Sequence, residues 1–273
     1  MPTILVLANE TIAGKPLLDR IRERASERAR FFVVVPQTRP RHGNVIYDEV
    51  VRDSAQVRVD LAVEFIRDLG AVADGEVGDQ DPFNAAMDAV RAQPIDEIIV
   101  STLPVSASSW IKRDLIERLE DATGVPVEHV VVDLAEGLPF DVTLVVANLT
   151  VAAPELVERL KALADEGPRR FIVIVPQSDV QGNAVREARQ RLRRLLASLD
   201  DEGIVAAGMI GDPDPYTAVM NAVQYFHISE IVISTLPEGS SQWVADKLVE
   251  RVRDATNVPV EHIESHSGAR AEA

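Results

Sequence analysis

Cysteine is absent from the 273-residue chain, which excludes disulfides, thiolate metal sites and cysteine nucleophiles. Long apolar runs are also missing, and none approaches the roughly 18 residues of a membrane helix, so we expect no membrane span. The N-terminus lacks the basic start and the small-residue cleavage site of a signal peptide, because a strand-like run begins at Thr3. Together these absences favour a cytoplasmic protein.

Positive charge is in short supply. The chain carries 28 Lys and Arg residues against 44 Asp and Glu residues, which gives a net charge of −16. Proteins that bind nucleic acid usually display a basic stripe, and anionic membrane surfaces attract the same charge. We therefore expect neither nucleic acid nor a membrane as a partner.

What the chain does contain is an internal repeat, its strongest positive signal. Val77–Val130 aligns without gaps on Ile210–Ile263, and about half of the aligned positions are identical. Both copies contain the motifs Gly-Asp-x-Asp-Pro, Ser-Thr-Leu-Pro and Val-Pro-Val-Glu-His. We expect two domains of ordinary size, residues 1–136 and 140–264, followed by a disordered polar tail over residues 265–273.

Within each copy, apolar strand-like runs alternate with segments of helical period. In the first copy we expect strands at Thr3–Ala8, Phe31–Val35, Ala71–Val77, Glu97–Val100 and Val125–Val132. Fully apolar strands separated by helices indicate a parallel sheet that is covered on both faces. We therefore predict an α/β fold of two tandem flavodoxin/Rossmann-like domains, each a five-stranded parallel sheet flanked by helices.

Sheets of this kind bind ligands beyond the carboxyl ends of their strands. This rule selects the residues after strands one, two and four as a candidate ligand-binding site in each copy. In the first copy these residues are Asn9, Thr11, Pro36, Gln37, Ser101, Thr102, Ser108 and Ser109. In the second copy they are Asn148, Thr150, Pro176, Gln177, Ser234, Thr235, Ser240 and Ser241. Structural roles are the alternative, with Asn and Gln closing turns and serines capping helices.

Neither copy presents a catalytic or a metal-binding constellation. No Ser/His/Asp order and no glycine-flanked nucleophile occurs, so we assign no catalytic residue. Gly-Asp-x-Asp-Pro carries two carboxylates, but Asp81 is well placed as the N-cap of a helix that begins at Pro82. We therefore assign no metal site.

The order of these motifs resembles the universal stress protein family in its tandem two-domain form, over nearly the whole chain. The resemblance implies flavodoxin-like or Rossmann-like domains, a stress-linked regulatory role and, in many family members, ATP or AMP as a ligand. Fifth strands of the family commonly pair across a two-fold axis. We therefore expect an intramolecular pseudo-dimer of the two copies, with further homo-oligomers possible.

Two departures from the family pattern bear on nucleotide binding. Members that bind ATP have Asp after strand one, where this chain has Asn9 and Asn148. Their glycine-rich phosphate loop is replaced by Ser-Thr-Leu-Pro, and its Gly-Ser positions hold Arg113-Asp114 and Asp246-Lys247. Without those glycines the backbone does not approach a triphosphate closely. We expect weak ATP binding or none and no certain cofactor, although an adenine nucleotide remains a possible ligand.

Three functions stay open at this point. The first is a regulatory protein that binds a small molecule, and the second is a nucleotide-dependent hydrolase or ligase that uses the same crevice. The third is a ligand-free module that binds a partner protein. The duplicated candidate sites carry Asn, Gln, Ser and Thr without an evident general base, which favours binding over catalysis.

Overall fold

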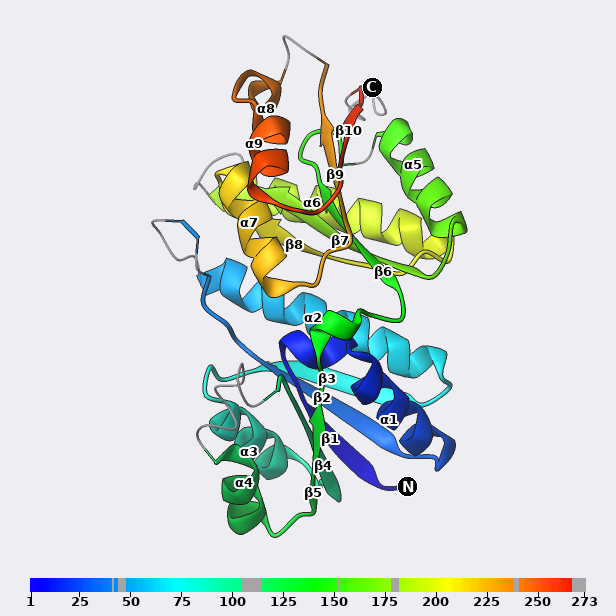
Figure 1. The fold of residues 1–273 in the computed structure, drawn as a ribbon, viewed down its shortest axis with the longest axis vertical. Helices are drawn as coiled ribbons and strands as arrows, with labels where there is room; N and C mark the ends of the chain where they lie inside the picture. Colours follow the sequence, from blue (N-terminus) through cyan, green and yellow to red (C-terminus); the bar gives the residue numbers. More distant parts are fainter. Residues whose placement is uncertain are drawn as a thin grey trace. The chain divides into compact units, whose positions relative to one another are not determined.

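The computed structural model describes residues 1–40, 42–43, 48–104, 114–151, 153–177, 182–237 and 241–266. The chain forms two compact units, each built around one sheet (Figure 1). The first unit comprises Met1–Thr38 and Ser54–Pro139, and the second comprises Arg39–Asp53 and Phe140–Ala273. Within the described ranges, no helix is both long enough and apolar enough to cross a membrane.

The first sheet is parallel throughout, with the strand order β3-β2-β1-β4-β5. Its strands are β1 (Thr3–Leu7), β2 (Arg30–Pro36), β3 (Val72–Gly78), β4 (Glu97–Thr102) and β5 (Val127–Val131). The helices are α1 (Lys15–Ser26), α2 (Asp48–Asp68), α3 (Pro82–Ala92) and α4 (Leu115–Thr123), with short 3-10 turns η1 (Glu10–Ala13) and η3 (Leu134–Glu136). Helices α3 and α4 pack together on one face of the sheet, and α1 lies on the other (Figure 1).

The second sheet repeats this order, read as β10-β9-β6-β7-β8, and is also parallel. Its strands are β6 (Asp141–Val146), β7 (Arg169–Pro176), β8 (Ala206–Gly211), β9 (Glu230–Thr235) and β10 (Val260–Glu264). The helices are α5 (Pro154–Asp165), α6 (Gly182–Asp201), α7 (Pro215–Tyr225), α8 (Gln242–Ala245) and α9 (Leu248–Ala255). The α/β fold predicted from the sequence, with one five-stranded parallel sheet in each copy, is confirmed.

The Gly-Asp-x-Asp-Pro motif explains how the third helix-forming segment starts. Asp81 accepts hydrogen bonds from the backbone N–H groups of Phe83 (2.9 Å) and Asn84 (3.3 Å), so the predicted N-cap is confirmed. Gly78 ends β3 beside this helix, and a Cβ at that position would lie 2.6 Å from the Cβ of Ala85. Glycine therefore lets α3 pack directly against the end of the strand.

The core of the second unit lies between its sheet and the helices α5 and α6. Leu160 and Leu195 meet Val145, Val173 and other strand residues there, all of them fully or almost fully buried. Burying one such side chain contributes about 1.5–3 kcal/mol, so this layer stabilises the sheet whose strands carry the candidate site at their carboxyl ends.

Two local features differ from the sequence-based expectation. The helix expected after strand four is split in the second copy into α8 and α9, which are separated by Lys247 in the left-handed region (φ 53°). Ser265, which we assigned to the disordered tail, is fully buried and donates its backbone N–H to the Thr235 carbonyl at 2.8 Å. Residues 267–273 of that tail lie outside the described residues.

Arg39–Asp53 belongs to the second unit, although the sequence-based division leaves this segment in the first copy. Asn221, which is 4% exposed, accepts a hydrogen bond from the His42 backbone N–H (3.1 Å) and donates one to the His42 carbonyl (3.2 Å). Arg189 lies 3.0 Å from the carboxylate of Asp53. These contacts join residues that are far apart in the sequence, so local patterns do not reveal them.

Candidate functional site

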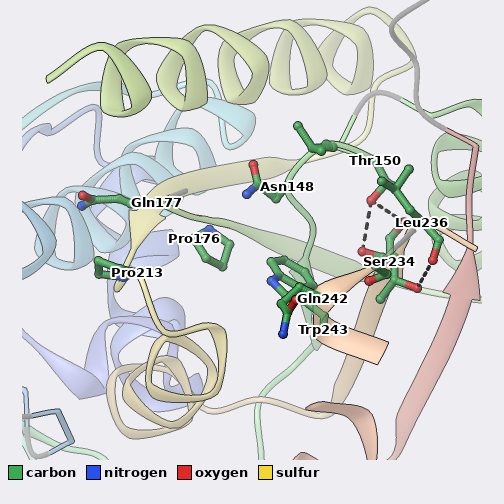
Figure 2. A pocket seen from close by; sticks show the side chains of 12 residues that line it. Asn148, Thr150, Pro176, Gln177, Pro213, Ser234, Leu236, Gln242 and Trp243 are labelled. Atoms are coloured by element: carbon green, nitrogen blue, oxygen red, sulfur yellow. Dashed lines mark hydrogen bonds between the residues drawn. The ribbon is translucent and has the colours of Figure 1, made fainter. Parts of the chain in front are cut away.

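A cavity of about 350 Å³ opens at the carboxyl ends of four strands in the second unit (Figure 2). It is lined after β6 by Asn148, Leu149 and Thr150, at and after β7 by Pro176 and Gln177, after β8 by Pro213, at and after β9 by Ser234, Thr235 and Leu236, and at the start of α8 by Ser241, Gln242 and Trp243. This volume lies at the small end of the range of roughly 300–1,000 Å³ that is usual for ligand pockets.

The structure brings the predicted site residues of the second copy together around this cavity. They are Asn148, Thr150, Pro176, Gln177, Ser234, Thr235 and Ser241. Ser240 lies outside the described residues. The sequence analysis missed the other lining residues, among them Trp243, although a tryptophan two positions after a candidate serine was a usable signal for an aromatic wall.

In the first copy the predicted residues take equivalent places at the strand ends. Those within the described part of the chain are Asn9, Thr11, Pro36, Gln37, Ser101 and Thr102, which end or follow β1, β2 and β4. The predicted residues Ser108 and Ser109 lie outside the described residues, so the structure does not place them.

In each copy, an arginine that the sequence analysis missed donates a hydrogen bond to the asparagine after the first strand. Arg191 on α6 donates from Nη2 to Oδ1 of Asn148 at 2.8 Å. Arg58 on α2 donates to Oδ1 of Asn9 in the same way, while Asn9 donates from Nδ2 to Thr38 at 2.7 Å. Burial lowers the pKa of the Arg191 guanidinium. The negative charge of Glu187, 4.0 Å away, offsets this lowering only in part.

A buried chain of hydroxyl groups forms the floor of the site in the second copy. Thr150 donates to the Ser234 carbonyl at 3.0 Å, and Ser234 Oγ donates to Thr150 Oγ1 at 2.9 Å. Ser265 Oγ lies 3.0 Å from Ser234 Oγ. Because all three residues are at most 2% exposed and bonded to one another, these hydroxyls stabilise the strand ends.

The first copy lacks the last hydroxyl group of this hydrogen-bonded series. Val132 stands at the position equivalent to Ser265, and Ser101 is the equivalent of Ser234. The hydroxyl of Ser101 is buried and has no hydrogen-bond partner among the described residues. The two sites therefore differ in polarity beneath the same motif.

A threonine–histidine pair closes the strand ends in both copies. Thr235 Oγ1 donates to the Leu236 carbonyl at 2.9 Å and lies 2.9 Å from Nε2 of His262. Thr102 makes the same two contacts with Leu103 and His129, at 2.9 and 2.8 Å. The tautomer in which the imidazole Nε2–H donates to the threonine oxygen satisfies both contacts at once, because the hydroxyl then donates to the carbonyl. In this arrangement the imidazole does not act as a base toward the hydroxyl.

The acidic motif takes part in turns rather than in a metal site. Asp212 accepts a hydrogen bond from the backbone N–H of Asp214 at 2.9 Å, and Asp214 accepts from the backbone N–H of Thr217 at 3.0 Å. Among the residues that the structure describes, no group of three or more His, Asp or Glu side chains is arranged to hold a metal ion.

Comparison with known proteins finds similarity to solved structures. No protein-family model matches the chain, and no curated protein matches it. The chain is similar to a universal stress protein from Archaeoglobus fulgidus, with 18% identity and a TM-score of 0.38, over 96% of each chain. A protein of unknown function from Pseudomonas aeruginosa matches with 16% identity and a TM-score of 0.33, over 97% of this chain and 93% of that chain.

A third structure, from the universal stress protein family of Burkholderia pseudomallei, has 16% identity and a TM-score of 0.33 and covers 46% of this chain and 97% of its own. Identities and TM-scores this low identify no ligand, activity or partner. Two of these three structures are of universal stress proteins, the family that the order of motifs in the sequence resembles.

Proposed function

We propose that this chain is a tandem, universal-stress-protein-like regulatory protein of the cytoplasm that binds a small molecule in the cavity of its second repeat. The cavity at the carboxyl ends of β6, β7 and β9 is the observation that carries the proposal. Parallel α/β sheets place their ligands at this edge, and the lining combines apolar walls with hydrogen-bonding groups. The stress-linked regulatory role comes from the family resemblance.

A cavity-filling pair of variants tests this proposal. Leu236→Trp places a bulky ring in the cavity wall, and Leu103→Trp makes the same change at the equivalent position of the first repeat. We expect native mass spectrometry of the gently purified protein to show a small molecule that wild type and Leu103→Trp retain and Leu236→Trp loses. Equal retention by all three proteins, or by none, would contradict the proposal.

ATP is a poor candidate for this ligand. None of the described residues that line the cavity carries a positive charge, and the glycine loop that would bring backbone N–H groups to a triphosphate is missing from the sequence. We expect calorimetric titration to show no low-micromolar ATP affinity in either repeat. An adenine nucleotide with fewer phosphates would meet the same lack of positive charge among the lining residues that the structure describes.

The nucleotide-dependent enzyme is the second candidate, and Thr235 bears on it directly. This cavity-lining hydroxyl lies 2.9 Å from an imidazole nitrogen, but it also has the Leu236 carbonyl at 2.9 Å as an acceptor for its proton. Binding therefore explains the site better than acyl or phosphoryl transfer. Turnover of ATP that is lost in Thr235→Val and kept in Thr102→Val would favour the enzyme. The third candidate, a ligand-free module for a partner protein, predicts no retained molecule.

We also propose that the fifth strands of the two copies mediate pairing between copies, as an intramolecular pseudo-dimer or in a homo-oligomer. Both β5 and β10 are edge strands of their sheets, and Val131 on β5 is 45% exposed. An exposed apolar edge strand favours pairing with another strand. Residues 1–136 expressed alone should self-associate or lose solubility. A monomeric half that is as stable as the full chain would exclude this arrangement.

A further inference from the structure

The loop after β2 is longer than its counterpart in the second repeat. Gln37 and Arg58 are 21 positions apart in the first copy, whereas the equivalent Gln177 and Arg191 are only 14 apart. The segment Arg39–Asp53, which we call the inserted segment, lies in this longer stretch and belongs to the second unit. A part of the first repeat that has no full-length counterpart in the second is therefore placed on the second unit.

Helix α7 holds the inserted segment through its main chain. Asn221 accepts a hydrogen bond from the His42 backbone N–H at 3.1 Å and donates one to the His42 carbonyl at 3.2 Å. Gln224 donates from Nε2 to the Arg39 carbonyl at 3.2 Å. Residues three apart on a helix share a face, so both amides address the same stretch of chain. The parts of the inserted segment that lie outside the described residues are 41 and 44–47.

The equivalent face of the first unit has a different pair of side chains. The positions that correspond to Asn221 and Gln224 hold Asp88 and Arg91 on α3. These two side chains are 64% and 70% exposed and form an ion pair with each other at 3.3 Å. A carboxylate cannot make both bonds that Asn221 makes, because it has no N–H group to donate to a backbone carbonyl. The main-chain recognition on α7 is therefore specific to the second unit.

The far end of the inserted segment meets helix α6 and the edge strand β8. Asp53 lies 3.0 Å from Arg189 on α6. Burial raises the pKa of the Asp53 carboxyl, and both Arg189 and the backbone N–H of Ile210 on β8 oppose this rise. Val50 and Val51, which precede Asp53 in the segment, are only 4% and 3% exposed. Both ends of the inserted segment are therefore bound to the second unit.

Strand β8 carries no charge of its own. Ala206–Gly211 consists of apolar residues and glycine, and all of them are buried or half-buried. Its counterpart β3 is an edge strand of the first sheet and leaves Val72, Asp74 and Glu76 exposed. Proteins protect edge strands from pairing with other chains by charged side chains or by a segment that covers the edge. Strand β3 has the first protection, and the inserted segment gives β8 the second.

From these observations we infer that the inserted segment is a docked cover for β8, held by Asn221 and Gln224, and that its release opens this edge to a second copy of the chain. The partner surface is β8 of that copy, since two identical uncharged edges can pair across a two-fold axis without repulsion between like charges. Because β8 and β10 lie at opposite edges of the second sheet, this inference is independent of the fifth-strand pairing and of the cavity.

Hydrogen exchange in the full chain, followed by mass spectrometry, tests the docking. Asn221→Ala should make peptides from the inserted segment exchange at least about tenfold faster than in wild type, because two hydrogen bonds to the segment are lost. Gln224→Ala, which loses one bond, should give a smaller increase in the same peptides. The matched variants Asp88→Ala and Arg91→Ala should leave the exchange of the segment unchanged.

Sedimentation velocity of the same proteins tests the cover. The two α7 variants should self-associate more than wild type at equal concentration, with slower exchange in β8 at high concentration, and the two α3 variants should not. A segment that exchanges no faster in the α7 variants, or one that exchanges faster without added self-association, overturns the inference. Equal effects of the α3 variants overturn it as well. If Asn221→Ala fails to fold, Gln224→Ala decides, because Gln224 is less buried.

Discussion

Arg191 donates a hydrogen bond to Asn148 across 2.8 Å, and this contact connects helix α6 to the rim of the cavity. The bond gives a partly buried guanidinium an acceptor and fixes which way the asparagine amide faces. Arg58 and Asn9 repeat the pair in the first copy. The residue after the first strand is therefore part of a structural contact in both repeats, in addition to its place at the candidate site.

Truncating the asparagine measures what the pair contributes. Asn148→Ala should lower the free energy of unfolding by about 1–3 kcal/mol, because a guanidinium group loses an acceptor in a partly buried place. Asn9→Ala should cost more, since Arg58 is only 2% exposed. Asn148→Asp should be at least as stable as wild type at neutral pH, because its bond to arginine is charge-assisted. Urea unfolding that ranks Asn148→Asp below Asn148→Ala would contradict this account.

The buried serines of β4 and β9 should respond to truncation with opposite signs. Ser101→Ala removes a hydroxyl that has no partner among the described residues, so we expect unchanged or higher stability, by up to about 1 kcal/mol. Ser234→Ala breaks the bonds to Thr150 and Ser265 and should cost about 1–2 kcal/mol. Urea unfolding of the two variants checks this, and a change of the same sign and size in both would be the contrary result.

Much of the fold could be predicted from the sequence because its signals are local. Apolar runs at Thr3–Ala8 and Glu97–Val100 predict buried parallel strands, and Asp81 before Pro82 predicts the start of α3. The crevice rule then selects residues such as Thr235 and Gln177 that line the cavity. These inferences need only strand order and the chemistry of short motifs.

The rest depends on contacts between distant residues. Arg58 reaches the first strand from the middle of a helix, and periodicity alone treats an arginine as exposed. Ser265 is buried and makes hydrogen bonds to β9, although the composition around it resembles that of a disordered tail. The break between α8 and α9 occurs at Lys247 without a glycine or proline to mark it. Asn221 holds the backbone of His42, which no local pattern reveals.

The left-handed residues before α4 and α9 offer a direct gain in stability. Asp114 (φ 50°) and Lys247 (φ 53°) occupy equivalent positions and are exposed. A side chain with a Cβ costs roughly 1–2 kcal/mol in this region, which glycine avoids at some cost in chain entropy. Lys247→Gly and Asp114→Gly should each raise the free energy of unfolding by up to about 1 kcal/mol. Lower stability in thermal unfolding of both variants would show that the side chains make contacts that outweigh the strain.

Because of Asp53, the free energy of unfolding should fall as the pH rises. Burial raises the pKa of its carboxyl group, and Arg189 at 3.0 Å lowers it only in part. A raised folded-state pKa means that the contribution of Asp53 to stability is present below the unfolded value, 3.8, and is lost as pH rises through the folded value. Asp53→Asn should therefore be more stable than wild type at pH 7, with the difference shrinking as the pH falls toward 3.8.

A neighbouring carboxylate provides the control for this measurement. Glu49 lies 3.5 Å from the same Arg189, but its side chain is 63% exposed, and exposed ion pairs contribute little. Glu49→Gln should leave the unfolding free energy close to that of wild type at both pH values. If Asp53→Asn behaves like Glu49→Gln in urea titrations at pH 7 and pH 4, the buried carboxylate does not have the effect assigned to it.

The central claim is that the second repeat binds a small molecule in the cavity at the carboxyl ends of its strands. Native mass spectrometry of the gently purified full chain, with wild type beside Leu236→Trp, tests it most directly. We expect wild type to retain a molecule that Leu236→Trp loses. Retention of the same molecule by both proteins, or by neither, would contradict the claim.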